Sequence, residues 1–478
     1  MSAGPGVGPP PGAGVPAGGR PRPVRAGPGV DDAVELLPAG PVRATLAAPA
    51  SKSVTNRALV CAALADGESM LAGPLASDDS DAMREAVAAL GARVADAGGA
   101  WRVRGTGGRP RSPDRPLDAR LSGTTMRFLA AVATLTPAGA TVTGRPGLLA
   151  RPIGPLTAAL RSLGAAVADA GGLPPVTAAG GGLAGGPVTV PTAWSSQFAS
   201  AVLLVAPFAR VPVRLAAEGL AAPGYVELTA EVMRWFGAVV ERDGAASWRV
   251  EPGRYQARAL EIEYDASAAG HLYALAAATG GEVTVANAVP GSRQPDAALP
   301  EVLARMGASV RRQGPSLTVA GPRVLAPVDV DLAAMPDQVT TVAVLAALAP
   351  GASRIRGVAV VRGHETDRLA ALAAELAKLG VGVEERPDGL VVHGGRARLV
   401  PARIATHGDH RLAMAFAAVA ARVPGVAIED PGCVAKTYPG FWHDLAAAGV
   451  RWRWPGAGAG PGPGNASQGR ATHRQRLT

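Results

Sequence analysis

The sequence predicts an α/β fold in which one unit is repeated six times and the copies are divided between two domains. A glycine that follows an apolar stretch recurs at intervals of 73, 73, 70, 73 and 69 residues. A polar cluster precedes each of these glycines by about 40 residues and opens an apolar run. The 478 residues exceed one ordinary core, so two domains of three units each are expected.

The recurring glycines predict the ends of helices. Glycine adopts the left-handed conformation that a helix C′ position requires, and the valine that follows favours a strand. Each unit is therefore expected to contain a capped buried helix, a strand or loop, a second helix that ends at glycine, and further strands. The glycines are Gly91, Gly164, Gly237, Gly307, Gly380 and Gly449.

The polar clusters predict the starts of buried helices, because small hydroxyl and acidic residues cap helices and apolar runs follow them. Helix N-termini also expose unpaired N–H groups, which makes them candidate anion sites. The clusters are Ser51-Lys52-Ser53, Ser122-Gly123-Thr124-Thr125, Ser195-Ser196-Gln197, Asp265-Ala266-Ser267, Asp337-Gln338 and Asp409-His410-Arg411. A short alternating strand is expected over residues 42–48, before the first cluster.

Both ends of the chain are expected to be disordered tails, over residues 1–37 and 455–478. The first 30 residues contain 9 Gly and 8 Pro, and such a segment cannot form a packed core. The formal charge of +9 lies mostly in the ends, and residues 31–450 carry only +1. The folded body is therefore not expected to bind nucleic acid.

The cysteines and the apolar runs of the sequence favour a cytoplasmic protein. Cys61 and Cys433 lack metal-binding spacing, and Cys61 lies in an apolar run that predicts a core position. No membrane span or signal-peptide core is recognisable. Walker, dinucleotide-binding and Ser-His-Asp motifs are absent from the sequence, which argues against nucleotide and hydride chemistry.

The first half of the chain offers cations beside helix starts. Lys52 is expected in the loop before a helix and Arg57 in its first turns; a capped helix with two solvated cations is the alternative. Gly123 permits a ligand to approach backbone N–H groups. Arg151 precedes Pro152, which suits the first helical position, and a cation there is better explained by a bound anion than by a surface role.

Two groups of neutral polar residues follow. Ser195, Ser196 and Gln197 suit a polyol or a phosphate. Tyr225 offers a phenol, for which ordinary packing is the alternative interpretation.

The second half supplies acids together with more cations. Asp337 is read either as a helix N-cap or as a chemical group. The segment Arg362–Arg368 packs five charged or titratable groups into seven positions, and Glu365 and Arg368 lie three apart. In the segment 407–415, Asp409 can cap a helix and leave Arg411 in its first turn. Lys436 lies in a loop before the last helix.

This inventory suits a substrate rich in phosphate and carboxylate, because cations outnumber acids and the two acids can exchange protons. No metal site is predicted, since His407, Asp409 and His410 lack a third ligand set with usable spacing. The cations are Lys52, Arg57, Arg151, Arg368, Arg411 and Lys436, and the acids are Asp337 and Glu365.

Taken together over residues 40–450, these motifs resemble the 5-enolpyruvylshikimate-3-phosphate synthase family of enolpyruvyl transferases. The resemblance implies a two-domain, inside-out α/β barrel with six βαβαββ repeats, three per domain. It implies that residues 38–50 and 264–454 form a first, discontinuous lobe and residues 51–263 a second. A monomer that takes shikimate 3-phosphate and phosphoenolpyruvate and needs no cofactor is expected.

The resemblance also assigns site residues. Asp337, Glu365 and Lys52 are the implied catalytic residues. The implied ligands of shikimate 3-phosphate are Lys52, Ser53, Arg57, Ser195, Ser196, Gln197, Tyr225, Asp337 and His364. The implied ligands of phosphoenolpyruvate are Lys52, Gly123, Arg151, Gln197, Arg368, Arg411 and Lys436.

The sequence departs from the family pattern at several positions. Ala50 replaces a Gly, Leu121 an Asn and Phe128 a Pro, while His364 stands in place of a Lys and Ala222 in place of a Ser. Gly123 implies sensitivity to glyphosate, because a Cβ there would crowd that inhibitor.

Two alternatives stay open. A transferase of the same fold that acts on UDP-N-acetylglucosamine normally uses a Cys-bearing loop near the middle of its first lobe. It is disfavoured, because neither Cys61 nor Cys433 lies there and Ser195-Ser196-Gln197 favours shikimate phosphate. A non-catalytic anion-binding protein is disfavoured by the presence of both Asp337 and Glu365.

Overall fold

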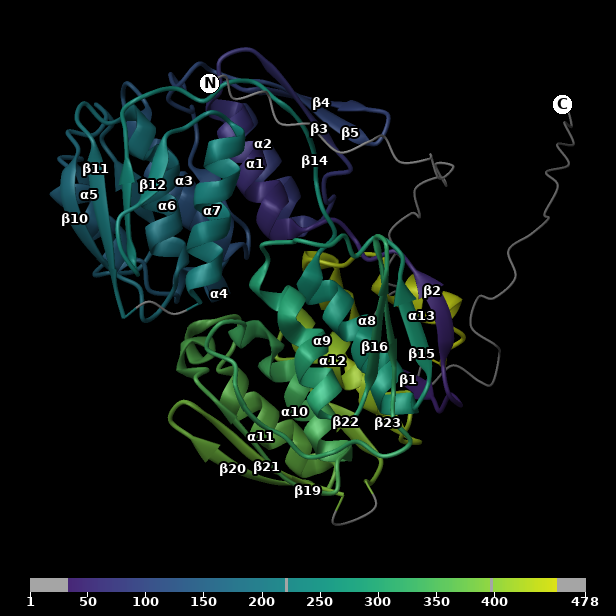
Figure 1. Cartoon of the computed structure of the whole chain (residues 1–478). Coiled ribbons are helices and arrows are strands. Elements are labelled where there is room, and N and C mark those ends of the chain that lie inside the picture. Colours follow the sequence, from purple (N-terminus) through teal and green to yellow (C-terminus); the bar gives the residue numbers. More distant parts are fainter. Residues whose placement is uncertain (1–32, 220–221, 396–398, 454–478) are drawn as a thin grey trace, which may run out of the picture.

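The computed structural model describes residues 33–219, 222–395 and 399–453, which form two lobes (Figure 1). Each lobe has its own buried apolar cluster. One cluster draws its residues from Val54 to Ile262 and defines the upper lobe of Figure 1. The other draws on Val34–Ala48 and Tyr264–Val450 and defines the lower lobe. The two-domain α/β fold is confirmed.

The upper lobe contains three units. The first consists of β14 (Ala259–Glu261), α1 (Lys52–Leu64), β3 (Glu68–Ala72), α2 (Asp78–Ala89), β4 (Arg93–Ala97) and β5 (Ala100–Arg104). The second consists of β6 (Leu117–Asp118), α3 (Gly123–Val132), β7 (Ala140–Thr143), α4 (Pro146–Leu149), α5 (Gly154–Ser162), β8 (Val167–Ala168) and β9 (Val176–Ala178). The third consists of β10 (Gly186–Pro191), α6 (Gln197–Val205), β11 (Val213–Glu218), α7 (Pro223–Trp235), β12 (Val240–Arg242) and β13 (Ser247–Val250).

The lower lobe repeats this plan. Its first unit consists of β2 (Arg43–Leu46), α8 (Ala266–Thr279), β15 (Glu282–Val285), α9 (Leu299–Arg305), β16 (Ser309–Gln313) and β17 (Ser316–Ala320). The second consists of β18 (Asp329–Asp331), α10 (Val339–Leu348), β19 (Gly351–Arg356), α11 (Arg368–Lys378), β20 (Gly382–Arg386) and β21 (Gly389–Gly394). The third consists of β22 (Ala402–Ile404), α12 (His410–Ala420), β23 (Val426–Glu429), α13 (Phe441–Ala447), β24 (Arg451–Arg453) and β1 (Ala33–Leu37).

The strands of the described residues form six four-stranded sheets, and every sheet has the same topology. In the order β6-β7-β9-β8, for example, β6 and β7 are parallel, and the other neighbours are antiparallel. The sheet that contains β2 follows this rule, with Ala44 opposite Val283 in a parallel pair. The identical pattern confirms six copies of a βαβαββ unit.

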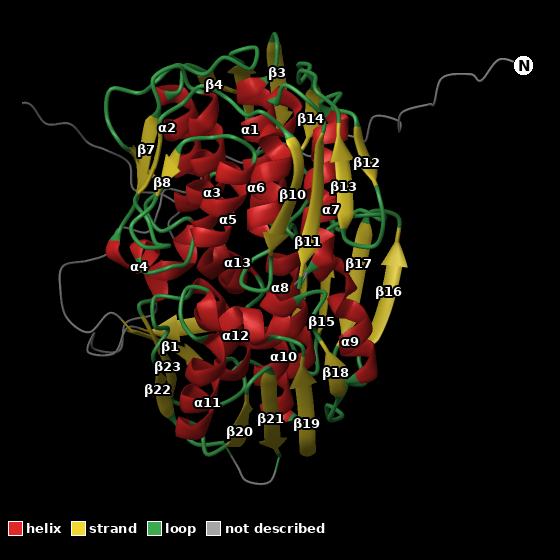
Figure 2. Cartoon of the chain, turned by 90° about the vertical axis from the view of Figure 1, so that its left-hand side faces the viewer, coloured by secondary structure: helices red, strands yellow, loops and turns green. Residues whose placement is uncertain are grey.

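The first helix of each unit lies inside its lobe, and the sheets lie at the outer edges (Figures 1 and 2). Helices α3 and α6 pack on each other, as do α8, α10 and α12. These helices are mostly apolar beyond their first turns, and such helices must be covered all round. Their side chains are buried over almost the full length. The inside-out arrangement is therefore confirmed.

The predicted helix boundaries are largely confirmed. The side chains of Ser51, Ser122, Asp265 and Asp409 accept hydrogen bonds from backbone N–H groups of α1, α3, α8 and α12. The six recurring glycines all follow the second helix of their unit and have φ between 83° and 102°. Only glycine adopts that conformation without strain, which explains the repeat.

The tail expected over residues 1–37 is wrong for residues 33–37, which form β1. This strand lies between β23 and β24, and Val34 and Leu36 are buried. Its alternating burial was masked by the Gly- and Pro-rich sequence before it, and its partners lie about 400 residues later. Residues 1–32 and 455–478 lie outside the described residues.

The chain crosses between the lobes twice, and the two crossings are hydrogen-bonded to each other. The Ser51 N–H donates to the Glu263 carbonyl at 2.8 Å, and the Asp265 N–H donates to the Pro49 carbonyl at 2.7 Å. Ala50 and Tyr264 form an antiparallel bridge. This double strand holds the starts of α1 and α8 side by side at the boundary between the lobes.

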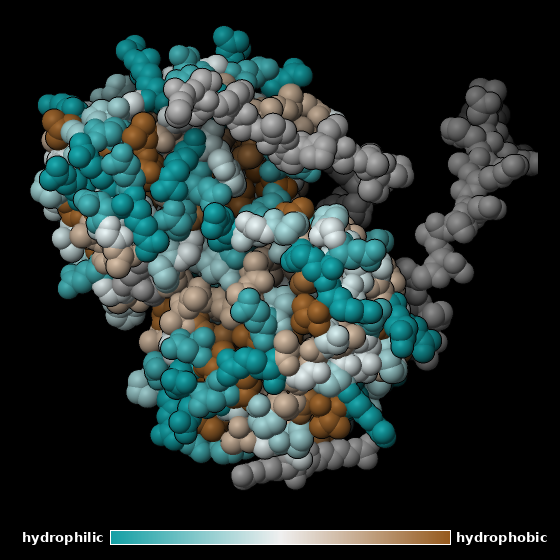
Figure 3. All heavy atoms as spheres, viewed as in Figure 1, coloured by the Kyte–Doolittle hydropathy of each residue, from teal (hydrophilic) through white to brown (hydrophobic). Residues whose placement is uncertain are grey.

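The surface and helix lengths complete the description. Hydrophilic side chains cover most of the face seen in Figure 3, and the molecule narrows between its lobes. Among the described residues, no helix has both the length and the apolar character needed to cross a membrane.

Candidate functional site

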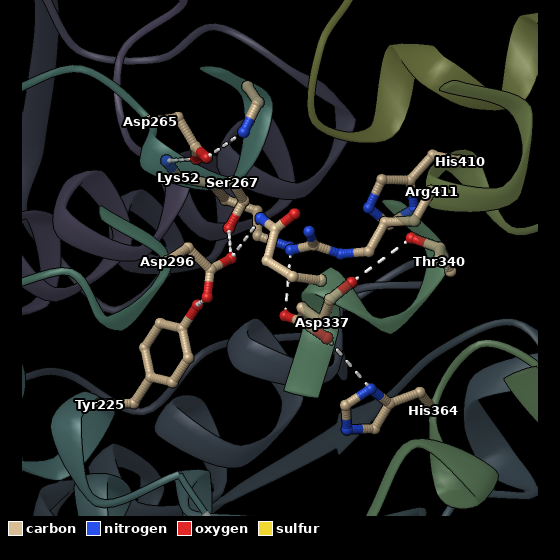
Figure 4. A network of polar contacts seen from close by, with 12 residues as sticks. Lys52, Tyr225, Asp265, Ser267, Asp296, Asp337, Thr340, His364, His410 and Arg411 are labelled. Carbon is tan, nitrogen blue, oxygen red and sulfur yellow. Dashed lines mark hydrogen bonds and ion pairs between the residues drawn. The ribbon is translucent and has the colours of Figure 1, made fainter. Parts of the chain in front are cut away.

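Polar and charged side chains from both lobes meet at the boundary between the lobes, and Figure 4 shows part of this network. Arg368, the first residue of α11, is the centre of this cluster and is 1% exposed. It forms ion pairs with Asp409 at 2.6 Å, Asp337 at 2.7 Å and Glu365 at 2.8 Å. Burial alone would lower the pKa of Arg368, but the three carboxylates outweigh it and raise the pKa. Arg368 is therefore a permanent buried cation.

Asp337 lies between three groups with positive or ionisable nitrogen. Its carboxylate is 2.7 Å from Arg368, 3.0 Å from Arg411 and 3.3 Å from His364 Nδ1. Burial alone would raise the pKa of Asp337, but Arg411 and its other partners hold the pKa well below its usual range. The alternative reading as an N-cap is wrong, because Gln338 occupies the N-cap position of α10.

Glu365 joins the lobes. It contacts Lys436 at 2.7 Å and Arg368 at 2.8 Å in the lower lobe, and Arg151 of the upper lobe at 3.6 Å. Burial alone would raise the pKa of Glu365, but Lys436, Arg151 and Arg368 hold it well below its usual range. An anionic ligand between the lobes would compete with Glu365 for these cations.

Lys52 and Arg57 come from α1. Lys52 is the first residue of that helix. Its predicted position in the preceding loop is therefore wrong. Its Nζ contacts Asp79 at 3.2 Å, and its backbone N–H donates to Asp265 at 3.1 Å. Arg57 is buried and donates to Thr229 Oγ1 at 2.7 Å. Burial lowers the pKa of Arg57 to about 10, so it stays charged at neutral pH.

Two arginines flank Gly123 at the start of α3. A Cβ on Gly123 would lie 2.9 Å from Nη1 of Arg127 and 3.4 Å from Nη1 of Arg151. Arg127 donates to Gln197 Oε1 at 2.7 Å. The start predicted at Pro152 is wrong, because α5 begins at Gly154. Arg151 therefore lies in the turn before that helix, where it reaches the other lobe.

The neutral polar residues lie on the upper-lobe side. Ser195 and Ser196 are buried at the start of α6, and Ser195 Oγ accepts from the Gln197 N–H at 3.2 Å. The Ser53 carbonyl accepts from Arg57 at 3.0 Å. The hydroxyl of Tyr225 donates to Asp296 of the lower lobe at 3.2 Å.

The structure adds residues that the sequence did not single out. Asp79 pairs with Lys52, Arg127 holds Gln197, and Asp296 receives Tyr225. Asp409 was predicted only as a cap, and it is also the nearest carboxylate to Arg368. Acids near helix starts are ordinarily explained by the helix dipole, so Asp79 and Asp296 carried no separate signal. Arg127 follows Gly123 in the same polar cluster, and that position was the available clue.

The donor set does not suit a metal. In the parts of the chain that the structure describes, no three His, Cys, Asp or Glu side chains are grouped so as to hold an ion. The acids of the cluster are instead matched by arginine and lysine.

Comparison with known proteins identifies the family. Residues 37–445 match the family described as EPSP synthase (3-phosphoshikimate 1-carboxyvinyltransferase). The chain belongs to the EPSP synthase family. A 3-phosphoshikimate 1-carboxyvinyltransferase of Methanosphaerula palustris is 42% identical over 417 residues, which cover 86% of this chain and 98% of that protein. One of Rhizobium etli is 38% identical over 424 residues, or 87% and 97% of the two chains.

Solved structures agree with this assignment. An EPSP synthase from Acinetobacter baumannii has a TM-score of 0.76 and 25% identity, and the match covers 88% of this chain and all of that chain. The enolpyruvyl transferase NikO from Streptomyces tendae has a TM-score of 0.72 at 19% identity, covering 89% and 99%, which supports the fold alone.

The residues that depart from the EPSP synthase pattern lie at or near the boundary between the lobes or in the upper core. Phe128 is buried, and the Arg57 guanidinium lies 5.3 Å from its ring centroid. His364 Nδ1 lies 3.1 Å from Arg368 and 3.3 Å from Asp337. Ala222 is buried with φ of 49°, at the N-cap position of α7. Ala50 lies in the bridge between the two lobe crossings, and Leu121 packs beside the upper core.

Proposed function

We propose that this chain transfers the enolpyruvyl group of phosphoenolpyruvate to the 5-hydroxyl of shikimate 3-phosphate and releases phosphate. The observation that carries the proposal is the meeting of Arg151, Arg411 and Lys436 with the acids around Arg368, in a chain of the EPSP synthase family. This is the step of the shikimate pathway, toward aromatic amino acids, that the family performs. The proposed reaction takes no cofactor.

Phosphoenolpyruvate is proposed to bind at the cations that now hold Glu365 and Asp337. Its phosphate and carboxylate match arginine and lysine in charge and in hydrogen-bond geometry. The proposed ligands are Lys52, Gly123, Arg151, Gln197, Arg368, Arg411 and Lys436. Gly123 belongs to this set because its missing side chain leaves room beside Arg127 and Arg151.

Shikimate 3-phosphate is proposed to bind along the upper lobe. Hydroxyl and amide groups at the start of α6 suit its phosphate and hydroxyls. Ser195 and Ser196 are supported by their burial at that helix start. The full proposed set is Lys52, Ser53, Arg57, Ser195, Ser196, Gln197, Tyr225, Asp337 and His364.

The two acids are proposed to exchange the protons of the reaction. Asp337 accepts the proton of the 5-hydroxyl of shikimate 3-phosphate as the hydroxyl oxygen attacks C2 of phosphoenolpyruvate. Glu365 delivers a proton to C3 of phosphoenolpyruvate. In the tetrahedral intermediate, Glu365 is a carboxylate and takes a proton back from C3 as the bond from C2 to the phosphate oxygen breaks. The enol ether forms, and the proton held by Asp337 leaves with the phosphate. Bound phosphoenolpyruvate pairs with the cations that otherwise pair with Glu365. Burial then raises the pKa of Glu365 toward a value suited to proton transfer. Lys52 stabilises the charge that develops on the phosphate oxygen.

Further parts of the proposal concern the whole chain. We assign the domains to residues 38–50 with 264–454 and to 51–263, with residues 33–37 added to the former. The two separate buried clusters support this division. A monomer in the cytoplasm is proposed, and the free thiols of Cys61 and Cys433 are compatible with a reducing compartment. The near-neutral folded body supports the absence of a nucleic-acid partner.

Phosphate release is the test. Wild type, Asp337→Ala, Glu365→Gln and the exposed control Glu301→Gln are assayed with both substrates and with each one omitted. Release that requires both substrates, falls at least about 100-fold in the first two variants and persists in the control would support the assignment. Ligand-induced thermal stabilisation without release would indicate a binding protein. Release with UDP-N-acetylglucosamine in place of shikimate 3-phosphate would indicate the other transferase.

A further inference from the structure

Asp296 is a buried acid whose partners come from both lobes. It lies in the 3-10 turn Pro295–Ala298 before α9, and it is 1% exposed. Tyr225 of the upper lobe donates to Oδ1 at 3.2 Å, and Gln338 donates Nε2–H to Oδ2 at 3.0 Å. Ser267 also donates to Oδ2. Figure 4 shows the Tyr225 ring approaching Asp296 from one side and Ser267 from the other.

Each partner of Asp296 belongs to a different part of the candidate site. Tyr225 lies in the first turn of α7, and its backbone carbonyl also accepts from Arg57 at 3.2 Å. Gln338 directly follows Asp337. Ser267 lies in the first turn of α8, next to the crossing between the lobes. One carboxylate thus ties an upper-lobe helix to the acid-bearing turn of the lower lobe.

The energetics argue against a purely structural role. Among the described residues, Asp296 has no ion-pair partner within 4.0 Å, and its three donors are neutral. Burial raises the pKa of Asp296, so the protein makes its charged form costly. A buried group that is expensive for the fold and holds substrate-contacting residues is best explained by the geometry that it enforces.

A solvent-facing contact offers a comparison on the same boundary. Glu231 of α7 pairs with Arg293, two residues before Pro295, at 3.4 Å. The Arg293 side chain is 69% exposed, so water screens this pair. Glu231 and Tyr225 therefore both link α7 to the same lower-lobe segment, but the Tyr225 contact ends on a carboxylate that is 1% exposed, whereas Arg293 faces solvent.

We propose that Asp296 is a positioning residue that couples closure of the lobes to the placement of the reacting groups. By accepting from Tyr225 and Gln338 at once, it brings the upper-lobe side of the shikimate 3-phosphate site and the Asp337 turn into one fixed arrangement. This inference rests on the proposed function. A protein whose binding-competent arrangement is less populated binds its ligand more weakly by the same factor.

The kinetic test compares Asp296→Asn with wild type and with the control Glu231→Gln. Asparagine keeps the shape of the side chain but replaces one acceptor oxygen by an NH2 donor. That donor would face either the Tyr225 hydroxyl or the donors of Gln338 and Ser267, which already donate to this side chain. We expect the KM for shikimate 3-phosphate to rise about tenfold with kcat changed less than about threefold, and the control to stay within about twofold. Equal KM values in Asp296→Asn and wild type would refute the proposal.

A double-mutant cycle tests the contact itself. Tyr225→Phe removes the donor that Asp296 receives, so the two substitutions together should raise the KM no more than either one alone. Multiplicative effects would show that the residues act independently and would refute the proposal. Should Asp296→Asn fail to fold by circular dichroism, Tyr225→Phe must enlarge the radius of gyration of the substrate-free protein, and an unchanged radius would refute the proposal.

Small-angle X-ray scattering separates this inference from the proposed function. Without substrates, Asp296→Asn should have a larger radius of gyration than wild type and Glu231→Gln. If wild type releases no phosphate, the proposed function fails, and the scattering comparison alone decides the role of Asp296. An unchanged radius of gyration would then refute it.

Discussion

Burial and neighbouring charges set the protonation state of individual buried residues in this protein. His271 of α8 is 2% exposed, and its Nδ1 lies 3.4 Å from Thr341 Oγ1. Burial, together with the positive charges of Arg411 and Arg368, lowers the pKa of His271 to about 3. The folded protein therefore keeps this ring neutral over the whole physiological range.

Acid should destabilise the protein through His271. Its folded pKa of about 3 lies below the unfolded value of about 6.5, so the unfolded state binds the proton first. The stability contribution is complete above pH 6.5 and is lost as the pH falls toward 3, by about 1.4 kcal/mol per pH unit. Urea unfolding at pH 7.5 and 5.5 should show a smaller loss in His271→Gln than in wild type. Identical losses would contradict this assignment.

Gly123→Ala should weaken both phosphoenolpyruvate and glyphosate binding. The new Cβ would press on Nη1 of Arg127 and touch Nη1 of Arg151, so the Arg127 guanidinium must shift and the space between the two arginines is reduced. We expect the KM for phosphoenolpyruvate and the inhibition constant of glyphosate each to rise about tenfold or more, or by at least about 1.4 kcal/mol. Gly147→Ala is the control, because its Cβ would meet only Leu121 at an ordinary 3.5 Å. Equal glyphosate sensitivity in wild type and Gly123→Ala would contradict the prediction.

At the scale of helices and strands, local signals predicted the ends of helices well and their exact starts less well. Caps and C′ glycines act within a few residues, so Ser122, Asp265 and Gly237 could be placed from the sequence alone. Lys52 and Pro152 were misplaced because a helix start also depends on tertiary partners. For example, the Lys52 N–H at the start of α1 donates a hydrogen bond to the Asp265 carboxylate at 3.1 Å.

Two of the recurring glycines allow backbone strain and crowding to be separated. Gly449 has φ of 86°, and a Cβ there would meet nothing within 4 Å. Gly164 has φ of 91°, and its Cβ would lie 2.9 Å from the Cβ of Ala184. Gly449→Ala should cost about 1–2 kcal/mol of unfolding free energy, and Gly164→Ala should cost more. Urea unfolding measures both, and a larger loss in Gly449→Ala would contradict the explanation.

At the scale of the whole molecule, the repeat predicted both lobes. Contacts between residues that lie far apart in the sequence could not be predicted. The polar clusters gave most members of the candidate site because each begins a buried helix that points at the boundary between the lobes. Asp296 and Asp79 were missed, since their partners Tyr225 and Lys52 lie 71 and 27 residues away. β1 was missed for the same reason, because its partners begin at Val426.

Truncation should show how much β1 contributes. A chain that begins at Pro38 lacks the buried side chains of Val34 and Leu36, whereas one that begins at Ala33 keeps them. Their burial contributes about 1.5–3 kcal/mol each. The shorter chain should therefore melt at a clearly lower temperature by calorimetry. Matching melting temperatures for the two chains would show that β1 is dispensable.

The position of β1 sets an order of events during synthesis. Every residue of the upper lobe's buried cluster has been synthesised once the chain reaches Ile262, before most of the lower lobe is made, so the upper lobe can fold first. The lower lobe begins with β1 and β2 and must hold them unpaired until later strands emerge. The last sheet closes only after Arg453 is added. β1 is thus translated long before either of its neighbours, β23 and β24, and the lower lobe completes its last sheet later than the upper lobe can form its core.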